Sequence, residues 1–297
     1  MSNVIAVHES RATDGMSAEE LARRAQDGDG ASLTALLERI QDDIYRLSLR
    51  MLWHPADAED ATQEILFKIV TSVATFRGDS SFRTWALRVA TNHLLNTRRS
   101  RVEAQSLTFE AFAKDLADGL PDEAANVAAP ASDEPDHALL VEEVKIGCTQ
   151  AMLLCLDRND RVAYILGDVF ELRSAEAGEV LGVEPAAFRK RLSRARARVR
   201  AFMRAHCGLV NEIAPCSCRR RVAPALERGR IDPQQWLFAG RGEPPSRRLP
   251  VLEAVGEMER LHEIAAIYQG HPVYRVPART VDEVKRVLAL TAPRLLS

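Results

Sequence analysis

Apolar residues recur at three- and four-residue intervals through much of the chain, which is the spacing of one face of an α-helix. The clearest stripe lies in residues 31–52 and consists of Leu33, Leu36, Leu37, Ile40, Ile44, Leu47 and Met51. Further stripes start near Asp57 and Phe82, and Ser17 with Glu20 forms a capping box that predicts another helix start. These patterns predict one compact helical domain over residues 17–102, after a disordered tail at 1–16.

A second helical pattern extends over residues 138–205. Within it, a short helix at 174–181, a turn at Gly182 and a long helix from Pro185 follow one another. Proline is favoured in a first helical turn, because its missing N–H has no partner there. A helix, a glycine turn and a basic helix in this order predict a helix-turn-helix.

Residues 206–297 have a different composition. A segment rich in Arg and Pro, with three cysteines, extends to about Pro250, and helical stripes follow at 251–268 and 281–290. We therefore expect an all-α protein with two helical domains, an acidic linker at 103–137 and a mostly helical C-terminal extension.

Composition narrows the class of protein. The chain has 297 residues, 40 Lys and Arg against 42 Asp and Glu, and only 5% aromatic residues, which favours helix over sheet. Its longest uncharged run, 146–156, has 11 residues, whereas a membrane-spanning helix needs about 20. No signal-peptide pattern opens the chain, and five cysteines fit a reducing compartment better than a disulfide framework. We expect a cytoplasmic protein without membrane insertion.

Charge is segregated along the chain, although the formal net charge is only -2. Residues 77–101 hold six Arg and one acid, and residues 182–204 hold eight basic residues and one acid. Residues 103–143, by contrast, hold eleven acids and one base. The linker predicted at 103–137 lies in this acidic block and includes a predicted short helix near 107–117. Two basic blocks separated by an acidic one are typical of two nucleic-acid contacts, although solvated helix faces give the same pattern.

The basic helix from Pro185 to Arg204 carries candidate DNA-binding chemistry. Phe188, Leu192 and Val199 share one face and predict packing against the preceding helices. The remaining surface is basic, so its first residues can reach base edges in the major groove and its later ones can bind phosphates. A solvated basic helix is the alternative interpretation.

Aromatic and basic residues interleave at the start of the helix from Phe82. Phe82 and Trp85 lie near Arg83 and Arg88, beside a Gly-Asp-Ser-Ser loop. This combination suits unstacked, single-stranded bases, because every base offers a face for stacking. The alternative is that both aromatic side chains belong to the core.

An acidic stripe is predicted on the helix that begins near Asp57. Asp57, Asp60 and Glu64, with Gln63 among them, share one face. Such a face repels DNA and suits a basic partner surface. A favourable interaction with the helix dipole explains Asp57 and Asp60 but not the whole stripe.

The order of these motifs resembles that of bacterial sigma factors. Residues 57–64 (DAEDATQE), 82–86 (FRTWA) and 90–99 (ATNHLLNTRR) resemble conserved region 2, and residues 182–196 (GVEPAAFRKRLSRAR) resemble region 4. The resemblance covers about residues 30–205 and leaves no space for regions 1.1 and 3. It therefore points to the extracytoplasmic-function (ECF) group of the sigma-70 family.

This resemblance implies a transcription initiation factor that is not an enzyme and requires no cofactor. It would bind promoter DNA and core RNA polymerase, at the β′ clamp helices and the β flap, and an anti-sigma factor is a further expected partner. The implied polymerase-binding residues are Asp57, Asp60, Gln63 and Glu64. The residues implied for the -10 element are Phe82, Arg83, Thr84, Trp85, Arg88, Asn92, Asn96, Arg98 and Arg99. The residues implied for the -35 element are Pro185, Ala187, Arg189, Lys190, Arg191, Ser193, Arg194 and Arg196.

The cysteines of the extension are candidate metal ligands. Cys207, Cys216 and Cys218, with His206 as the nearest fourth donor, would supply the four ligands that Zn²⁺ prefers. Their spacing is not a standard zinc spacing, so a redox pair or ordinary structural residues are alternatives. The other two cysteines, at 148 and 155, lie in an apolar stretch and are predicted to be core residues.

A second function class stays open. A stand-alone helix-turn-helix regulator with a cysteine-based sensor domain would bind duplex DNA without polymerase. The acidic stripe and the aromatic residues discriminate between the two, because a plain repressor needs neither. The chain lacks a Gly-rich phosphate loop, a His-Glu-x-x-His helix and a Gly-x-Ser-x-Gly elbow, which disfavours an enzyme. In either class we expect the extension to be regulatory.

Overall fold

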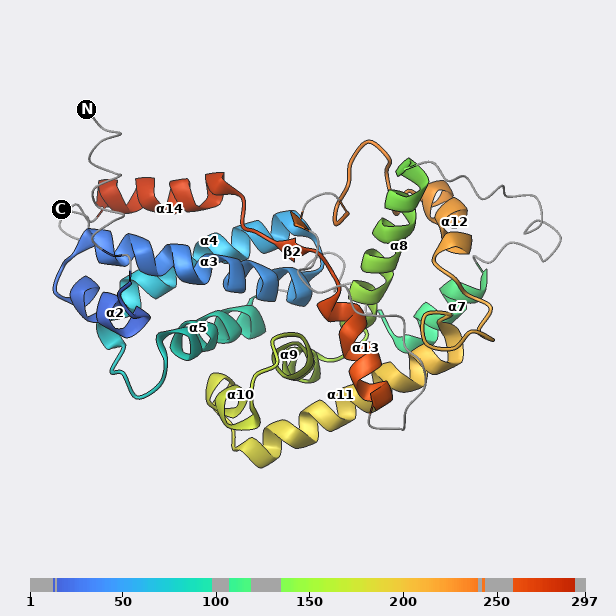
Figure 1. Ribbon diagram of the computed structural model, residues 1–297, viewed down its shortest axis with the longest axis horizontal. Coiled ribbons are helices and arrows are strands. Elements are labelled where there is room, and N and C mark those ends of the chain that lie inside the picture. The colour runs from blue at the N-terminus through green and yellow to red at the C-terminus, as the bar shows by residue number, and fades with distance from the viewer. Residues whose placement is uncertain are drawn as a thin grey trace.

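The computed structural model describes Thr13 and residues 15–97, 107–118, 135–239, 242–243 and 259–291. Figure 1 shows helices through nearly all of these ranges, with one short pair of strands. The prediction of an all-α protein is therefore confirmed. None of the described helices is long and apolar enough to cross a membrane.

Side-chain caps fix the starts of two helices in the N-terminal unit, and the cap at Ser17 was predicted from the sequence. Its elements are α2 (Ala18–Gln26), α3 (Gly30–Leu52), α4 (Pro55–Ser72), η1 (Val73–Thr75) and α5 (Phe82–Asn96). The Ser17 hydroxyl accepts the N–H of Glu20 at 3.0 Å, and the Ser81 hydroxyl accepts the N–H of Thr84 at 3.0 Å. These bonds satisfy N–H groups that have no partner within the helix, and so fix the starts of α2 and α5.

The second unit contains the predicted helix-turn-helix. Its elements are α8 (Pro135–Leu154), α9 (Arg158–Tyr164), the π-turn η3 (Ile165–Val169), α10 (Ser174–Leu181) and α11 (Pro185–His206). Gly182 ends α10 with φ 63°, a left-handed conformation that glycine adopts without a Cβ clash. Pro185 opens α11. In the preceding linker, the predicted short helix is present as α7 (Phe109–Asp118).

The two units pack directly against each other. In Figure 1, α10 lies beside α5, and α9 lies below α3. Arg158 donates to the carbonyls of Leu94 at 3.0 Å and Thr97 at 2.5 Å, at the end of α5. The buried Arg161 donates to the carbonyl of Met51 at 2.6 Å, at the end of α3. Two arginines of α9 thus satisfy carbonyls that the ends of α5 and α3 leave open.

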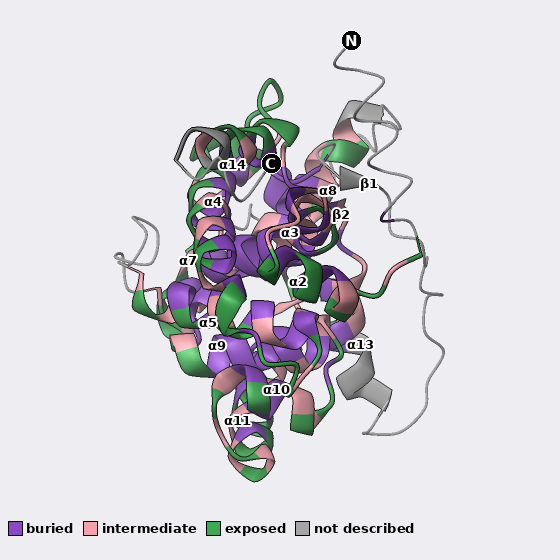
Figure 2. Cartoon of the chain, turned by 90° about the vertical axis from the view of Figure 1, so that its left-hand side faces the viewer, coloured by how far each residue is buried: buried purple, intermediate pink, exposed green. Residues whose placement is uncertain are grey.

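The extension returns to the N-terminal unit. Its elements are η4 (Arg219–Arg221), α12 (Val222–Glu227), β1 (Gly242–Glu243), α13 (Glu259–Gln269), β2 (Val273–Tyr274) and α14 (Ala278–Thr291). Strands β1 and β2 form an antiparallel pair that the sequence did not predict. The helix predicted at 251–268 appears as α13, while 251–258 lie outside the described residues. Figures 1 and 2 both show α14 alongside α4.

Candidate polymerase and DNA interfaces

Helix α11 has a buried face and an exposed basic face. Phe188 and Val199 are fully buried and Leu192 nearly so, which confirms the predicted packing face. Pro185, Ala187, Arg191 and Arg196 are half-buried. The exposed residues among those implied for the -35 element are Arg189, Lys190, Ser193 and Arg194.

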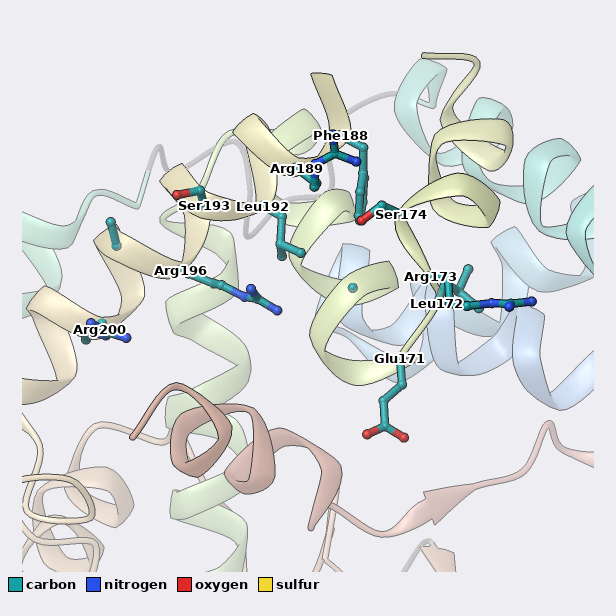
Figure 3. A pocket seen from close by; sticks show the side chains of 12 residues that line it. Glu171, Leu172, Arg173, Ser174, Phe188, Arg189, Leu192, Ser193, Arg196 and Arg200 are labelled. Carbon is teal, nitrogen blue, oxygen red and sulfur yellow. The ribbon is translucent and has the colours of Figure 1, made fainter. Parts of the chain in front are cut away.

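A hollow of about 690 Å³ lies beside α11 (Figure 3). Arg189, Arg196 and Arg200 line it from α11, and Arg173 lines it from the segment before α10. Glu171 is the one acidic residue of the lining, and its side chain points away from α11 in Figure 3. The hollow therefore presents mainly positive charge, which favours a phosphate or another anionic group.

Two arginines implied for the -35 element are already paired within the protein. Arg194 donates to Asp160 at 3.0 Å, and Arg196 donates to both carboxylate oxygens of Asp168, at 3.0 and 3.1 Å. Asp160 and Asp168 are buried. The structure therefore gives Arg194 and Arg196 a part in holding α11 on α9 and η3.

The aromatic residues at the start of α5 differ in exposure. Phe82 is buried, whereas Trp85 is half-buried. Their ring centroids lie 5.5 Å apart, and Phe76 completes the cluster at 5.6 Å from Phe82 and 5.7 Å from Trp85. The core interpretation holds for Phe82, while Trp85 keeps an accessible side.

That accessible side borders an open pocket of about 370 Å³. Trp85, Arg88 and Asn92 line it from α5, and the segment 75–80, which includes Asp79, forms the opposite side. Glu179 of α10 also borders the pocket, so its present shape depends on the contact between α5 and α10. An aromatic ring, a cation and an amide around one pocket suit an unstacked base with its phosphate.

Other residues implied for the -10 element are buried or already make contacts within the protein. Thr84 is buried. Arg83 pairs with Asp43 at 2.5 Å and lies 4.0 Å from Glu176 of α10. Asn96, exposed at the end of α5, donates to the carbonyl of Asn92 at 2.8 Å. The last two implied residues, at 98 and 99, lie outside the described residues.

The acidic stripe lies on α4 as predicted. Asp60 and Glu64 are exposed, and Asp57 and Gln63 are half-buried. Glu59, next to the stripe, is buried and pairs with Arg279 of α14. No pattern in the sequence predicted that α14 would flank the stripe.

A buried histidine connects α4 with α5. His93 Nε2 lies 3.5 Å from Glu64, and Lys68 Nζ lies 2.6 Å from His93 Nδ1. Burial, and then the positive charge of Lys68, lower the pKa of His93. A neutral His93 ring can accept the hydrogen bond of Lys68, so this side of the stripe is tied to the helix that carries Trp85.

The predicted zinc ligands do not form a centre as they stand. Among the described residues, no group of three or more His, Cys, Asp or Glu side chains is arranged to hold a metal ion. His206, expected as the fourth ligand, packs on Phe202 with ring centroids 4.9 Å apart. Cys155 is a core residue as predicted. Cys148 is half-buried and packs against the same core, and it also lines one cavity together with the three cysteines of the extension.

The residues that sequence reasoning missed are acidic partners of the basic faces. Asp160 and Asp168 fix α11, and Asp43 and Glu176 hold Arg83. Asp168 stands alone in the apolar run 162–170. A single acid in such a run is the one available signal, because a buried carboxylate requires a partner.

Comparisons with known proteins match the two units separately. A family model of sigma-70 region 2 matches residues 36–103, and a model of sigma-70 region 4 matches residues 146–199. The extension from residue 206 lies beyond both matches.

Curated relatives match the same part of the chain. The ECF sigma factor SigE of Mycolicibacterium smegmatis is 29% identical over 183 residues, covering 60% of this chain and 65% of that protein. The ECF sigma factor SigW of Bacillus subtilis is 25% identical, covering 61% of this chain and 94% of that protein. A solved structure of CnrH in complex with the cytosolic domain of CnrY is 21% identical, with a TM-score of 0.41, and covers 62% of this chain and 94% of that one. Because both sigma regions occur in order and the relatives are ECF factors, this chain belongs to the ECF group of sigma-70 factors.

Proposed function

We propose that this sigma factor directs core RNA polymerase to promoters by reading duplex -35 DNA with α11 and single-stranded -10 DNA with α5. The observation that carries the proposal is the pocket of Trp85, Arg88 and Asn92 on a chain that also has a helix-turn-helix. A regulator that reads only duplex DNA needs the second feature and not the first.

The -35 contact would use the exposed first half of α11. Arg189, Lys190 and Ser193 lie on that surface, where a helix placed in the major groove meets base edges. Arg200, further along the hollow of Figure 3, is placed for a phosphate. Arg194 and Arg196 support this surface through their pairs with buried acids.

The -10 contact would use stacking. Unpairing and unstacking DNA costs a few kcal/mol per step, and a base stacked on an aromatic side chain returns about 1–3 kcal/mol. Trp85 is the half-exposed ring of its cluster, and the buried Phe82 supports it from below. Arg88 and Asn92 would then hold the phosphate and the edge of the flipped base.

The polymerase contact would use the exposed acids Asp60 and Glu64 of α4. Their charge suits a basic surface and excludes DNA. An anti-sigma factor that binds the same faces is a further expected partner.

Run-off transcription with purified core polymerase, with and without this protein, on a pool of genomic promoter fragments tests the function. Transcripts that appear only with the protein support a sigma factor and give the -35 and -10 sequences. If the protein alone binds duplex DNA and no transcripts appear, either with the full chain or with a chain that lacks the extension, the stand-alone regulator is supported instead.

A further inference from the structure

We propose that the extension is an intramolecular latch that holds the helix-turn-helix unit closed against the N-terminal unit. The latch consists of residues 237–239 and 259–291. This inference rests on the proposed function, because its consequence is that the protein binds polymerase and promoter only after the latch opens.

Glu143 of α8 anchors the first part of the latch. Its buried carboxylate accepts the backbone N–H groups of Leu237 at 2.8 Å, Phe238 at 3.0 Å and Ala239 at 2.6 Å. The buried Phe238 ring packs edge-on against Trp53, at the end of α3, with centroids 5.5 Å apart. One turn of the extension thereby contacts both units.

Tyr268 of α13 makes the second bridge. This fully buried residue donates its hydroxyl to the carbonyl of Thr149 in α8 at 3.1 Å. Its own carbonyl accepts a long bond, 3.5 Å, from Arg50 of α3, and its ring lies edge-on to Tyr164 of α9 at 5.4 Å. A single side chain and its backbone therefore join α3, α8 and α9.

Helix α14 closes the latch over α3 and α4 (Figures 1 and 2). The N–H of Val276 donates to Asp42 at 3.0 Å, and Lys285 pairs with Glu38 at 2.8 Å. Arg279 pairs with Glu59, which directly precedes Asp60 of the acidic stripe. A partner that docks on the stripe meets α14 at its border.

The closed arrangement also occupies the -10 helix. The hydroxyl of Thr84 donates to Glu176 of α10 at 3.3 Å, and the same carboxylate lies 4.0 Å from Arg83. Positions -35 and -10 are 25 base pairs apart, roughly 85 Å of duplex at 3.4 Å per pair. While α10 is in contact with both α5 and α11, α5 and α11 cannot reach the two elements together, so the two units must separate before promoter recognition.

The test uses the full chain with latch variants and neighbouring controls. Glu143→Ala removes the acceptor for the loop, and Glu142→Ala, at a half-buried pair with Lys145, is its control. Arg279→Glu repels Glu59, and Arg286→Glu, whose partner Glu283 lies in the same helix, is its control. Because Glu143→Ala leaves buried N–H groups unpaired, the exposed Arg279→Glu keeps the test valid if that variant is unstable.

Small-angle scattering and core-polymerase affinity give separate readouts. We expect both latch variants to have a larger radius of gyration and to bind core polymerase about tenfold more tightly, because affinity scales with the fraction of open molecules. Controls should match the wild type. An unchanged radius in both folded latch variants overturns the latch, as does an expanded chain with unchanged affinity. An expanded chain that binds polymerase more tightly but gives no transcripts supports the latch and overturns the proposed function.

Four of the five cysteines surround one small cavity, and from this separate observation we infer a site for a thiophilic metal ion, with Zn²⁺ as the chemical fit. Cys148 comes from α8, Cys207 from the end of α11, and Cys216 and Cys218 from the following loop. The cavity of about 20 Å³ has room for a single atom or water. Four thiolates are a ligand set of structural zinc sites.

The backbone around the thiols supports this inference. Cys207 and Cys216 pair in an isolated bridge, in which the N–H of Gly208 donates to the Cys216 carbonyl at 2.8 Å. A Cβ at Gly208 would lie 2.5 Å from that carbonyl oxygen, so this approach requires glycine. Burial raises the pKa of the Cys207 thiol, and the N–H groups of Leu209 and Val210, which face its sulfur, act against this rise by favouring the thiolate.

Cations also line the cavity. Lys145 and Arg221 are part of its wall and would offset the excess negative charge of four thiolates on one divalent ion. Binding requires the sulfur atoms to turn further toward the cavity centre, since no three donors yet have metal-binding geometry among the described residues. A bound ion would fasten the beginning of the extension to α8.

Metal content of the purified full chain tests this site. We expect one Zn²⁺ per chain after dialysis against Zn²⁺, and thiolate-to-metal absorption bands after replacement by Co²⁺. Cys148→Ser should lose both signals, whereas Cys155→Ser, a buried cysteine outside the cavity, should keep them. Wild-type protein that binds no more metal than Cys148→Ser overturns the site, and so does a disulfide among these cysteines in freshly purified protein.

Discussion

Arg196 and Asp168 form an ion pair in which the Arg196 Nε donates to both carboxylate oxygens, at Nε···O distances of 3.0 and 3.1 Å. The hydrogen bond to Asp168 raises the pKa of Arg196. The pair joins the middle of α11 to η3, so an arginine with the sequence context of a DNA contact holds in place the helix that we propose binds DNA.

Arg196→Ala should therefore lower stability. Removing one partner of a buried pair costs about 3–5 kcal/mol, but the Arg196 side chain is 38% exposed, so we expect about 2 kcal/mol after solvent screening. Urea unfolding measures this loss. A change below about 0.5 kcal/mol would show that the pair is not structural.

Arg189→Ala, unlike Arg196→Ala, should lower DNA affinity and leave stability almost unchanged. Arg189 is exposed and borders the hollow of α11, so its loss should leave the free energy of unfolding within about 0.5 kcal/mol of the wild type. Affinity for -35 duplex should fall, by about 1–3 kcal/mol if it reads a base. Urea unfolding measures the free energy of unfolding, and titration with promoter and mutated-promoter duplexes measures the affinity. A loss that is equal on all sequences, with a salt slope reduced by about one, would identify a phosphate contact instead.

Trp85→Ala should slow open-complex formation more than closed promoter binding. The ring contributes its stacking only once the base is unpaired, and this contribution is about 1–3 kcal/mol. Permanganate footprinting of unpaired thymines measures opening, and filter binding at low temperature measures the closed complex. Trp85→Phe is the matched control and should restore most of the opening rate. Equal losses in both measurements would exclude a role specific to melting.

Hydrophobic periodicity predicted the helices of both sigma units because each buries one regular face, as Phe188, Leu192 and Val199 do on α11. The helix ends at Ser17 and Gly182 were also predictable, because a cap depends on the residue type at one position. Periodicity says nothing about which charged side chain meets which.

The pairs of Arg83 with Asp43 and of Arg279 with Glu59 join residues 40 and 220 positions apart, so only the tertiary fold brings them together. The shared cavity of Cys148 and Cys207 was missed for this reason. From the sequence alone, the apolar neighbours of Cys148 indicate an ordinary core residue. Only the fold shows that the segment with Cys207 lies beside it.

Mild acid should destabilise the latch through His271. This residue is buried next to Tyr268, and its Nε2 lies 2.9 Å from the Thr149 hydroxyl. Burial, and then the charges of Arg50 and Lys145 that face it, lower its pKa well below the usual 6.5. His271 binds a proton near pH 6.5 in the unfolded chain but not in the folded chain. The free energy of unfolding is therefore at its full value above pH 6.5 and falls as the pH decreases below it.

Between pH 7.5 and 5.5 this single group should lower the free energy of unfolding by at most about 1.4 kcal/mol, the limit for a ring that stays neutral in the folded chain. Urea unfolding at the two pH values measures the loss, and scattering at pH 5.5 should show an increased radius if the latch opens first. His271→Asn keeps a hydrogen-bonding side chain but cannot titrate, so it should remove this part of the pH dependence. His137→Asn, at the start of α8, is the control. If His271→Asn keeps the full wild-type slope, the acid sensitivity belongs to other groups.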